Sequence, residues 1–139
     1  MKLQSYLAFN GNCQEAINFY KDVFDAQVTT LMHFKDAPED VMCVPDEAKN
    51  LVMHATLEFQ DCLFMMSDTI DEANFVKGNN FSMSINVADV DEALAIFNSL
   101  KEGGMEFMPF ADAFWGGKFG MLVDKFGVQW MVSSEHKPS

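Results

Sequence analysis

Few side chains in this sequence could carry out acid-base or metal chemistry, and His54 is the leading candidate. The alternation of residues 53–58 predicts a strand with His54, Thr56 and Glu58 on one face. Residues four apart along a strand lie about 13 Å from each other, so His54 and Glu58 cannot share a proton or a metal ion directly. A lone histidine on a strand can equally be a structural hydrogen-bonding group, and both interpretations stay open.

A second histidine offers a partner for such chemistry. His33 lies in a β-rich segment, and it would meet His54 if the two strands pair in register. Two imidazoles, completed by Glu58 or Glu106, would then form a divalent-metal site. The simpler alternative places His33 at an exposed strand end.

Aromatic side chains surround a glycine pair in the second half of the chain. Phe114, Trp115 and Phe119 flank Gly116-Gly117, a pattern that is typical of a hairpin turn. Such rings can hold a planar or apolar ligand. They can equally contact a second subunit, and the pattern favours neither.

The three cysteines, Cys13, Cys43 and Cys62, are widely spaced and include no Cys-x-x-Cys pair. This pattern is typical of a reducing compartment and indicates neither a disulfide framework nor a zinc knuckle. Cys13 begins a predicted helix, whose dipole would lower the pKa of the thiol, so it is a candidate reactive group. The N-terminus lacks the apolar run of a signal peptide, and no segment is apolar enough to span a membrane. We therefore expect a cytoplasmic protein.

The composition excludes some partners. A chain of 139 residues is long enough for one domain with a substantial core, here rich in Phe and Met. The formal net charge of −12 creates a negative field that repels phosphate backbones and anionic lipids. For this acidic protein we expect neither a nucleic-acid partner nor a membrane partner.

The sequence contains an internal repeat, which relates residues of its first half to residues of its second half. Segment 12–16 recurs 77 residues later as segment 89–93, and segment 61–67 aligns with segment 127–133. At the first offset the opening strands of the two halves align, which pairs Ser5 with Ser82, Leu7 with Ser84 and Phe9 with Asn86. Two similar halves, each too small to bury a core alone, predict a single domain of paired modules with a cleft between them.

Hydrophobic periodicity predicts the same β-α-β-β-β order in both modules. In module one, residues 1–68, a capping box of Asn12 and Glu15 begins the helix. After a joint at residues 69–80, the helix of module two, residues 81–134, begins at Asp89 and ends at Gly103-Gly104, and residues 135–139 form a tail. The predicted strands are 2–9, 28–34, 51–59 and 62–67 in module one, and 81–87, 105–110, 119–123 and 128–133 in module two. The acidic residues 35–50, with two prolines, predict an exposed loop with one helical turn after the second proline.

Several segments, in the right order, resemble a known family. The segment Tyr6-Leu-Ala-Phe-Asn-Gly-Asn-Cys-Gln-Glu-Ala-Ile-Asn-Phe-Tyr20, the segment Val52-Met-His-Ala55 and residues 115–130 are similar to the PhnB-like family of the vicinal-oxygen-chelate superfamily. That superfamily includes glyoxalase I, bleomycin- and fosfomycin-resistance proteins and extradiol dioxygenases. The resemblance implies an α+β fold in which two βαβββ modules form a curved mixed-sheet cup, and it implies a homodimer that can exchange modules.

The resemblance also shows which positions of this chain would hold a metal ion if it had the metal site of its metal-dependent relatives. In metal-dependent members, four cup-facing side chains of the first and last strands hold one divalent ion, and these positions correspond to Ser5, Met65, Ser82 and Met131. A neutral hydroxyl and a thioether are poor ligands for Zn, Fe, Mn or Ni, so we expect neither a metal nor another cofactor. Some PhnB-like proteins carry a methyltransferase label, but this sequence lacks the glycine-rich strand-to-helix loop that would cradle S-adenosylmethionine.

In the cup that the resemblance implies, the repeat and the strand alternation predict an uncharged lining. Its expected lining is Ser5, Leu7, Phe9, Leu63, Met65, Ser67, Ser82, Ser84, Asn86, Gln129, Met131 and Ser133, and His54, Phe114, Trp115 and Phe119 complete the candidate ligand-binding set. Apolar surface with scattered hydroxyls and amides suits reversible binding of a moderately apolar small molecule better than stabilisation of a charged transition state. We therefore predict a metal-independent small-molecule-binding protein with no catalytic residue. The alternatives are a metal-dependent lyase, isomerase or dioxygenase-like enzyme with a displaced site near His54, and a structural dimer with a Met-filled cup.

Overall fold

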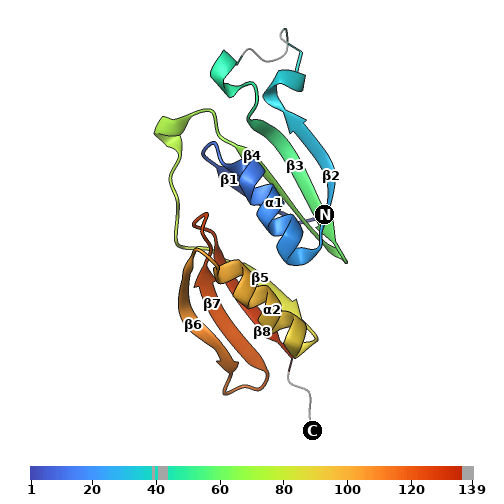
Figure 1. Cartoon of the computed structure of the whole chain (residues 1–139), viewed down its shortest axis with the longest axis vertical. Helices are drawn as coiled ribbons and strands as arrows, with labels where there is room; N and C mark the ends of the chain where they lie inside the picture. The colour runs from blue at the N-terminus through green and yellow to red at the C-terminus, as the bar shows by residue number, and fades with distance from the viewer. Residues whose placement is uncertain (39, 41–43, 136–139) are drawn as a thin grey trace. The chain divides into compact units, whose positions relative to one another are not determined.

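The computed structural model describes residues 1–38, 40 and 44–135, and the chain separates into two compact units, which we call unit one (Met1–Val76) and unit two (Lys77–Ser139). Figure 1 shows the elements of both units. The order in unit one is β1 (Ser5–Phe9), α1 (Cys13–Phe24), β2 (Gln27–His33), β3 (Val52–Phe59) and β4 (Cys62–Asp68). The order in unit two is β5 (Met83–Val87), α2 (Val90–Lys101), β6 (Met105–Asp112), β7 (Lys118–Val123) and β8 (Gln129–Ser134). Within the described residues, no helix is long and apolar enough to cross a membrane.

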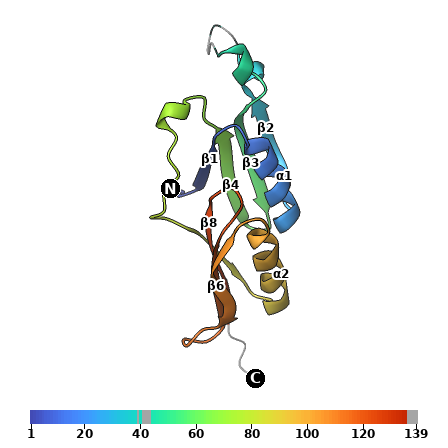
Figure 2. The same cartoon turned by 60° about the vertical axis from the view of Figure 1, so that its left-hand side comes forward.

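Both units have the same sheet topology. The strand orders are β1-β4-β3-β2 and β5-β8-β7-β6, with the first strand parallel to the last and the other pairs antiparallel. The predicted α+β class with two βαβββ modules is confirmed, and the predicted strands are offset from the observed ones by no more than a few residues at either end. Each helix packs on one face of its own sheet, which the turned view in Figure 2 shows for α1 and for α2.

The core of unit one lies between α1 and the sheet. The helix buries Ala16, Ile17, Tyr20 and Phe24, the interior face of a 3.6-residue repeat. The ring of Tyr20 meets that of Phe64 on β4 edge to face, with centroids 5.6 Å apart. The sheet residues that complete this core are Leu7, Phe9, Val52, Ala55, Leu57, Phe64 and Met66.

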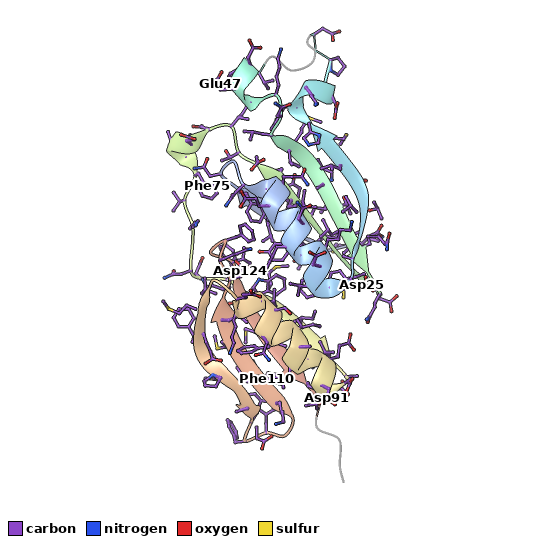
Figure 3. All side chains as sticks on the ribbon, viewed as in Figure 1. Asp25, Glu47, Phe75, Asp91, Phe110 and Asp124 are labelled. Atoms are coloured by element: carbon purple, nitrogen blue, oxygen red, sulfur yellow. The ribbon has the colours of Figure 1, made fainter. Side chains whose placement is uncertain are left out.

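The core of unit two is built in the same way. The buried residues of α2 are Ala93, Ile96, Phe97 and Leu100, which follow a 3.6-residue repeat. On the sheet, Trp130, Leu122 and Val132 are buried. Phe97 also packs against Phe110 of β6, with ring centroids 5.6 Å apart, and Figure 3 labels Phe110 beside α2.

The predicted face of the first strand is wrong. Ser5, Leu7 and Phe9 were expected to line the cup, but Leu7 and Phe9 are buried against α1, and Ser5 pairs with the buried Phe64. Leu7 pairs with Met66, and in unit two Ile85 pairs with the equivalent Val132, so the strands align at an offset of 78 rather than 77.

The physical reason for this slip is one additional residue in a turn. Residues 10–12 separate β1 from α1, whereas residues 88–89 separate β5 from α2. Gly11 lies in the longer turn with a φ of 88°, a conformation that favours glycine. The helices therefore keep the offset of 77 while the strands do not, and a slip of one residue moves every side chain of a strand to the opposite face.

The two helices also begin differently. Asp89 accepts a hydrogen bond from the backbone N–H of Asp91, as predicted for an N-cap. Asn12 makes no side-chain cap to α1, so the predicted capping box is wrong. The carboxylate of Asp68 takes that place, because its Oδ1 accepts from the backbone N–H groups of Gly11 and Cys13 at 2.9 and 3.0 Å.

The connections carry short 3₁₀ turns. The turn Phe34–Asp36 begins at the last residue of the predicted strand 28–34 and continues into the predicted acidic loop, and Asp46–Ala48 is the turn predicted after Pro45. Glu72–Asn74 forms a third turn in the expected joint. Cys43 and His136 lie outside the described residues.

Candidate functional site

Each sheet has one face that its helix does not cover, and we call these the open face of unit one and the open face of unit two. Side chains that are directly opposite on paired strands lie on the same face of the sheet. In unit one, the cross-strand row Tyr6, Met65, Thr56 and Thr30 runs across β1, β4, β3 and β2. Because Met65 and Thr56 are only partly buried while their neighbours Met66 and Leu57 are buried, this row belongs to the open face.

Three polar side chains form a hydrogen-bonded chain on the open face of unit one. The hydroxyl of Tyr6 lies 3.2 Å from Nδ1 of His54, and Nε2 of His54 lies 3.2 Å from Oγ1 of Thr56. The ring centroids of Tyr6 and His54 are 5.7 Å apart. His54 therefore has a partner at each ring nitrogen, and its contact with Thr56 shows that the two side chains share one face of β3, as the alternation predicted.

Tyr6 is the member of this chain that the sequence analysis missed. The offset of 77 placed Ser5 on this face and turned Tyr6 toward the helix. The structural offset of 78 instead makes Tyr6 the counterpart of Ser84, and these residues pair with Met65 and Met131 respectively. Counting the turn residues between strand and helix in each half would have revealed the difference.

The proposed meeting of His33 with His54 does not occur. His54 pairs with Met32, and a register irregularity places His33 opposite Val52. The side chain of His33 instead caps the short turn that follows, with Nδ1 3.9 Å from Oδ2 of Asp36. His33 is thus a strand-end residue, as the simpler alternative predicted.

The open face of unit two carries the residues expected there. Ser84, Met131, Met121 and Met108 form a row across β5, β8, β7 and β6. The next row contains Asn86, Ser133 and Phe119, in which Nδ2 of Asn86 donates to Oγ of Ser133 at 3.1 Å. Gln129 also lies on this face, and the exposed Ser82 immediately precedes β5.

The aromatic residues of the β6–β7 hairpin form a connected group. The ring centroid of Trp115 lies 4.9 Å from that of Phe114 and 5.6 Å from that of Phe119, and the rings meet edge to face in both cases. Phe119 pairs with Ser133, so the group joins the open face of unit two at the end nearest this hairpin. Phe114 and Trp115 are exposed. The predicted Gly116-Gly117 turn is confirmed, with positive φ at both glycines.

The donors on these strands do not fit a divalent metal. The open-face side chains of β1, β4, β5 and β8 are Tyr6, Ala8, Leu63, Met65, Ser67, Ser84, Asn86, Gln129, Met131 and Ser133. None is an imidazole or a carboxylate, the groups that such ions prefer. Across residues 1–38, 40 and 44–135, no three His, Cys, Asp or Glu side chains gather closely enough to hold a metal ion. Glu106, the other ligand considered, pairs with Lys101 at 3.3 Å.

The turn between β1 and α1 does not fit a nucleotide-type cofactor either. A helix N-terminus binds an anion through its unpaired backbone N–H groups. Here Asp68, which is buried, already accepts from Gly11 and Cys13, and its Oδ2 accepts from Val52 at 3.0 Å. A carboxylate of the protein itself therefore occupies the position that a cofactor anion would need.

The Cys13 thiol is not the reactive group considered from the sequence. Its side chain is buried at the start of α1. Burial, and secondly the negative charge of Asp68, raise the pKa of this thiol well above its ordinary value. The expected lowering of the pKa by the helix dipole is therefore wrong, because desolvation outweighs it.

This raised pKa predicts a loss of stability in alkali. The folded state keeps Cys13 protonated, while the unfolded chain releases the proton as the pH rises above 9.0. Stability from this group is complete below that pH and falls by about 1.4 kcal/mol per pH unit above it. Urea unfolding at pH 7 and pH 10.5 should show a smaller alkaline loss in Cys13→Ala than in wild type. Cys62→Ala, which changes an exposed thiol, is the matched control, and equal losses in both variants would contradict the prediction.

A hollow of about 500 Å³ lies in unit one, and its lining does not include Tyr6 or His54. It is formed by the N-terminal segment and the β3–β4 hairpin, and its lining is Lys2, Leu3, Gln4, Glu58, Gln60, Asp61, Cys62 and Leu63. Leu63 alone among these was expected to line the cup. The hollow shares Glu58 and Leu63 with the open face of unit one, and its lining contains three charged side chains, Lys2, Glu58 and Asp61.

Comparison with known proteins identifies a matching family model and a similar protein of Escherichia coli. A family model described as 3-demethylubiquinone-9 3-methyltransferase matches residues 1–133. Protein YjdN of Escherichia coli (strain K12) is 29% identical over 143 residues, which cover 96% of this chain and 95% of the relative.

Solved structures match as well. The crystal structure of protein PA1353 from Pseudomonas aeruginosa has 35% identity and a TM-score of 0.84, with 99% of each chain covered. The PhnB protein from Bacillus cereus has 27% identity and a TM-score of 0.79, covering 96% of this chain and 99% of that one. A glyoxalase/bleomycin resistance protein/dioxygenase from Nocardioides, with 12% identity, a TM-score of 0.59 and coverage of 100% and 87%, shares the fold.

Proposed function

Because this chain belongs to the PhnB-like family, whose model is described as 3-demethylubiquinone-9 3-methyltransferase, within the glyoxalase/bleomycin-resistance/dioxygenase superfamily, we propose that it is a metal-independent small-molecule-binding protein. The ligand is a moderately apolar molecule that binds against the open faces, in the cup that the two modules line in this superfamily. The residues that contact it are His54, Met65, Ser67, Ser84, Asn86 and Met131, with Ser82, Phe114, Trp115 and Phe119 at the margins and Tyr6 in place of Ser5, Leu7 and Phe9.

The observation that carries this proposal is the chemistry of the two rows. In each row a hydroxyl on the first strand stands beside a methionine on the last, Tyr6 with Met65 and Ser84 with Met131. Methionine adapts its shape to varied apolar ligands, and hydroxyl and amide groups supply a few directed hydrogen bonds. Stabilisation of a charged transition state is favoured by charged groups aimed at it, and the side chains of these two rows carry no charge.

The methyltransferase activity in the family description is not part of the proposal. Asp68 accepts from the first backbone N–H of α1, that of Cys13, and from Gly11, the one glycine in the preceding turn. Such a turn offers no phosphate- or carboxylate-binding loop of the Gly-x-Gly type. The disagreement concerns the activity alone, because family membership rests on the match over residues 1–133.

The proposal extends to the assembly and the compartment. We place the protein in the cytoplasm because its three cysteines show no disulfide pattern. We expect a homodimer, as in the superfamily, with no nucleic-acid or membrane partner because of the net charge of −12. Size-exclusion chromatography with light scattering measures the assembly directly.

The test compares metals with neutral ligands on tag-free protein. Elemental analysis measures any bound metal, and thermal unfolding is then followed with Zn, Mn, Fe(II) and Ni, and with a library of neutral, moderately apolar compounds. A compound at 100 times its dissociation constant should add about 2.7 kcal/mol and raise Tm by several degrees. A stoichiometric metal that His54→Ala removes would instead make the protein a metalloenzyme with a displaced site.

A matched pair of variants locates the binding. Met131→Glu places a carboxylate on the open face of unit two, where Met131 is partly exposed, and should abolish the ligand-induced rise in Tm. Leu94→Glu makes the same change on the exposed surface of α2, where Leu94 is 42% exposed, and should leave the rise intact. If no neutral compound stabilises wild type, or if both variants respond as wild type does, the proposed site is wrong and the purely structural alternative gains.

A further inference from the structure

The chain of Tyr6, His54 and Thr56 has the geometry of a proton relay. Each of its two contacts measures 3.2 Å, and the three groups come from two strands that β4 separates. Tyr6 is 49% exposed, so its hydroxyl is the outer end, while His54 is partly buried and Thr56 is the inner end. A hydroxyl at the surface is thereby connected through an imidazole to a second hydroxyl.

Such a chain can be polarised in either direction. With the proton of the neutral imidazole on Nε2, Tyr6 donates to Nδ1 and His54 donates to Thr56, so the lone pairs of the Tyr6 oxygen are free for a donor. With the proton on Nδ1, His54 donates to Tyr6, and Tyr6 donates outward. The Nδ1 lone pair of a neutral His54 faces the Tyr6 hydroxyl, so the imidazole can accept a proton that a ligand releases through Tyr6.

The surroundings of this chain are uncharged on the adjoining strands. Met65 and Ser67 lie beside it on β4, and Met32 lies opposite His54 on β2. The nearest charge on β3 is Glu58, which lies four residues, about 13 Å, from His54 and two residues, about 7 Å, from Thr56 along the strand. No positive side chain stands on these strands to attract an anion from solution, so a ligand that arrives neutral and ionises in place fits better than a carboxylate or a phosphate.

We propose that the Tyr6–His54–Thr56 chain binds the acidic hydroxyl group of a phenol- or enol-type ligand and takes up its proton. The inference rests on the proposed binding function and adds the chemical class of the ligand. The O–H bond of the ligand breaks as its proton moves to the oxygen of Tyr6. The former proton of Tyr6 moves to Nδ1 of His54 and forms the N–H bond there. The products are a ligand anion and an imidazolium whose Nε2–H donates to Thr56, with no change in electron count.

The test uses two small aromatic probes that differ only in whether they carry a hydroxyl group or its methyl ether. 4-Nitrophenol is yellow only as its anion, and 4-nitroanisole has the same ring with a methyl ether in place of the hydroxyl. Just below the pH at which free 4-nitrophenol ionises, wild-type protein should increase the yellow anion and should bind the phenol more tightly than the ether. Equilibrium dialysis measures the binding of both probes independently of colour.

The variants separate the relay from the apolar surface. Tyr6→Phe and His54→Gln should remove the colour change and weaken 4-nitrophenol binding by about 10- to 100-fold, with 4-nitroanisole binding unchanged. Thr56→Val should weaken both effects less. Thr30→Val removes a hydroxyl at the other end of the same row and is the matched control, expected to behave as wild type. If both probes bind equally and no colour develops, the relay is wrong and the binding function stands. If neither probe binds, the relay and the proposed binding function are both wrong for phenol-type ligands.

A second measurement needs no ligand. The ¹⁵N chemical shifts of the imidazole, assigned by their loss in His54→Gln, report which ring nitrogen carries the proton. We expect a single tautomer in wild type and a mixture in Tyr6→Phe, because one fixed partner is lost. A mixture in both proteins would overturn the relay even if the phenol binds.

Discussion

Asp68→Ala is expected to lower the free energy of unfolding of unit one by about 3–5 kcal/mol. The buried carboxylate accepts from three backbone N–H groups, those of Gly11, Cys13 and Val52, at 2.9 to 3.0 Å. Each buried donor left without an acceptor costs about 1–3 kcal/mol, and water that enters the space recovers part of this. Because a domain of this size is stable by only about 5–15 kcal/mol, the loss would be a large fraction of the total.

The geometry also predicts how a conservative change behaves. In Asp68→Asn the single carbonyl oxygen can still accept from Gly11 and Cys13, but the amide then presents donors to the N–H of Val52. Asp68→Asn should therefore lower the free energy of unfolding, but by less than Asp68→Ala does. Urea unfolding gives the energies, and amide hydrogen exchange shows whether protection falls in unit one while unit two keeps its own. Equal costs for the two variants would mean that the amides are satisfied without Asp68.

Asp124→Ala is expected to destabilise unit two by a similar amount, about 3–5 kcal/mol. Asp124, labelled in Figure 3, lies between β7 and β8 and is buried. Its Oδ1 accepts from the backbone N–H groups of Phe126 and Val128, and its Oδ2 accepts from the indole Nε1 of Trp130 at 2.9 Å. One carboxylate therefore closes the turn and fixes the largest core side chain of β8.

A double-mutant cycle separates the two roles of Asp124. Trp130→Phe removes the indole donor and leaves the two turn bonds, so it should cost about 1–3 kcal/mol, less than Asp124→Ala. The double variant should cost less than the sum of the single changes, because the two side chains share a bond. Strict additivity would show that the bond at 2.9 Å contributes nothing to stability. Fluorescence of the remaining tryptophan, Trp115, and circular dichroism both follow the unfolding.

The two aspartates supply the hydrogen bonds of their turns from outside the open faces. Each satisfies the backbone of a turn on its own unit, so the turns need no side chains from the open faces. Ser134, the counterpart of Asp68 in unit two, has a related task, since its Oγ donates to the carbonyl of Ala88 at 3.4 Å in the strand-to-helix turn. The hydroxyls of Tyr6 and Ser84 remain on the open faces, where the proposed function uses them.

Local pattern was sufficient wherever one segment decides its own structure. Residues 81–87 alternate strictly, so Ser84 and Asn86 lie on the predicted face of β5. The 3.6-residue spacing of Ala93, Phe97 and Leu100 likewise identifies the buried side of α2. The duplicated β-α-β-β-β order followed from the repeat, because both halves bury the same kind of helix on the same kind of sheet.

Tertiary structure decided what depends on one residue in a turn or on partners distant in the chain. The extra residue in the turn that holds Gly11 reversed the face of β1, because side chains in a strand alternate with a period of two. Burial against α1 then selected Leu7 and Phe9 for the core and left Tyr6 on the open face, within reach of His54, which lies 48 residues away. Asp68 replaced Asn12 as the cap of α1 because β4, parallel to β1, ends beside that helix. Periodicity shows which residues of a strand share a face, whereas only packing decides which of the two faces the helix covers.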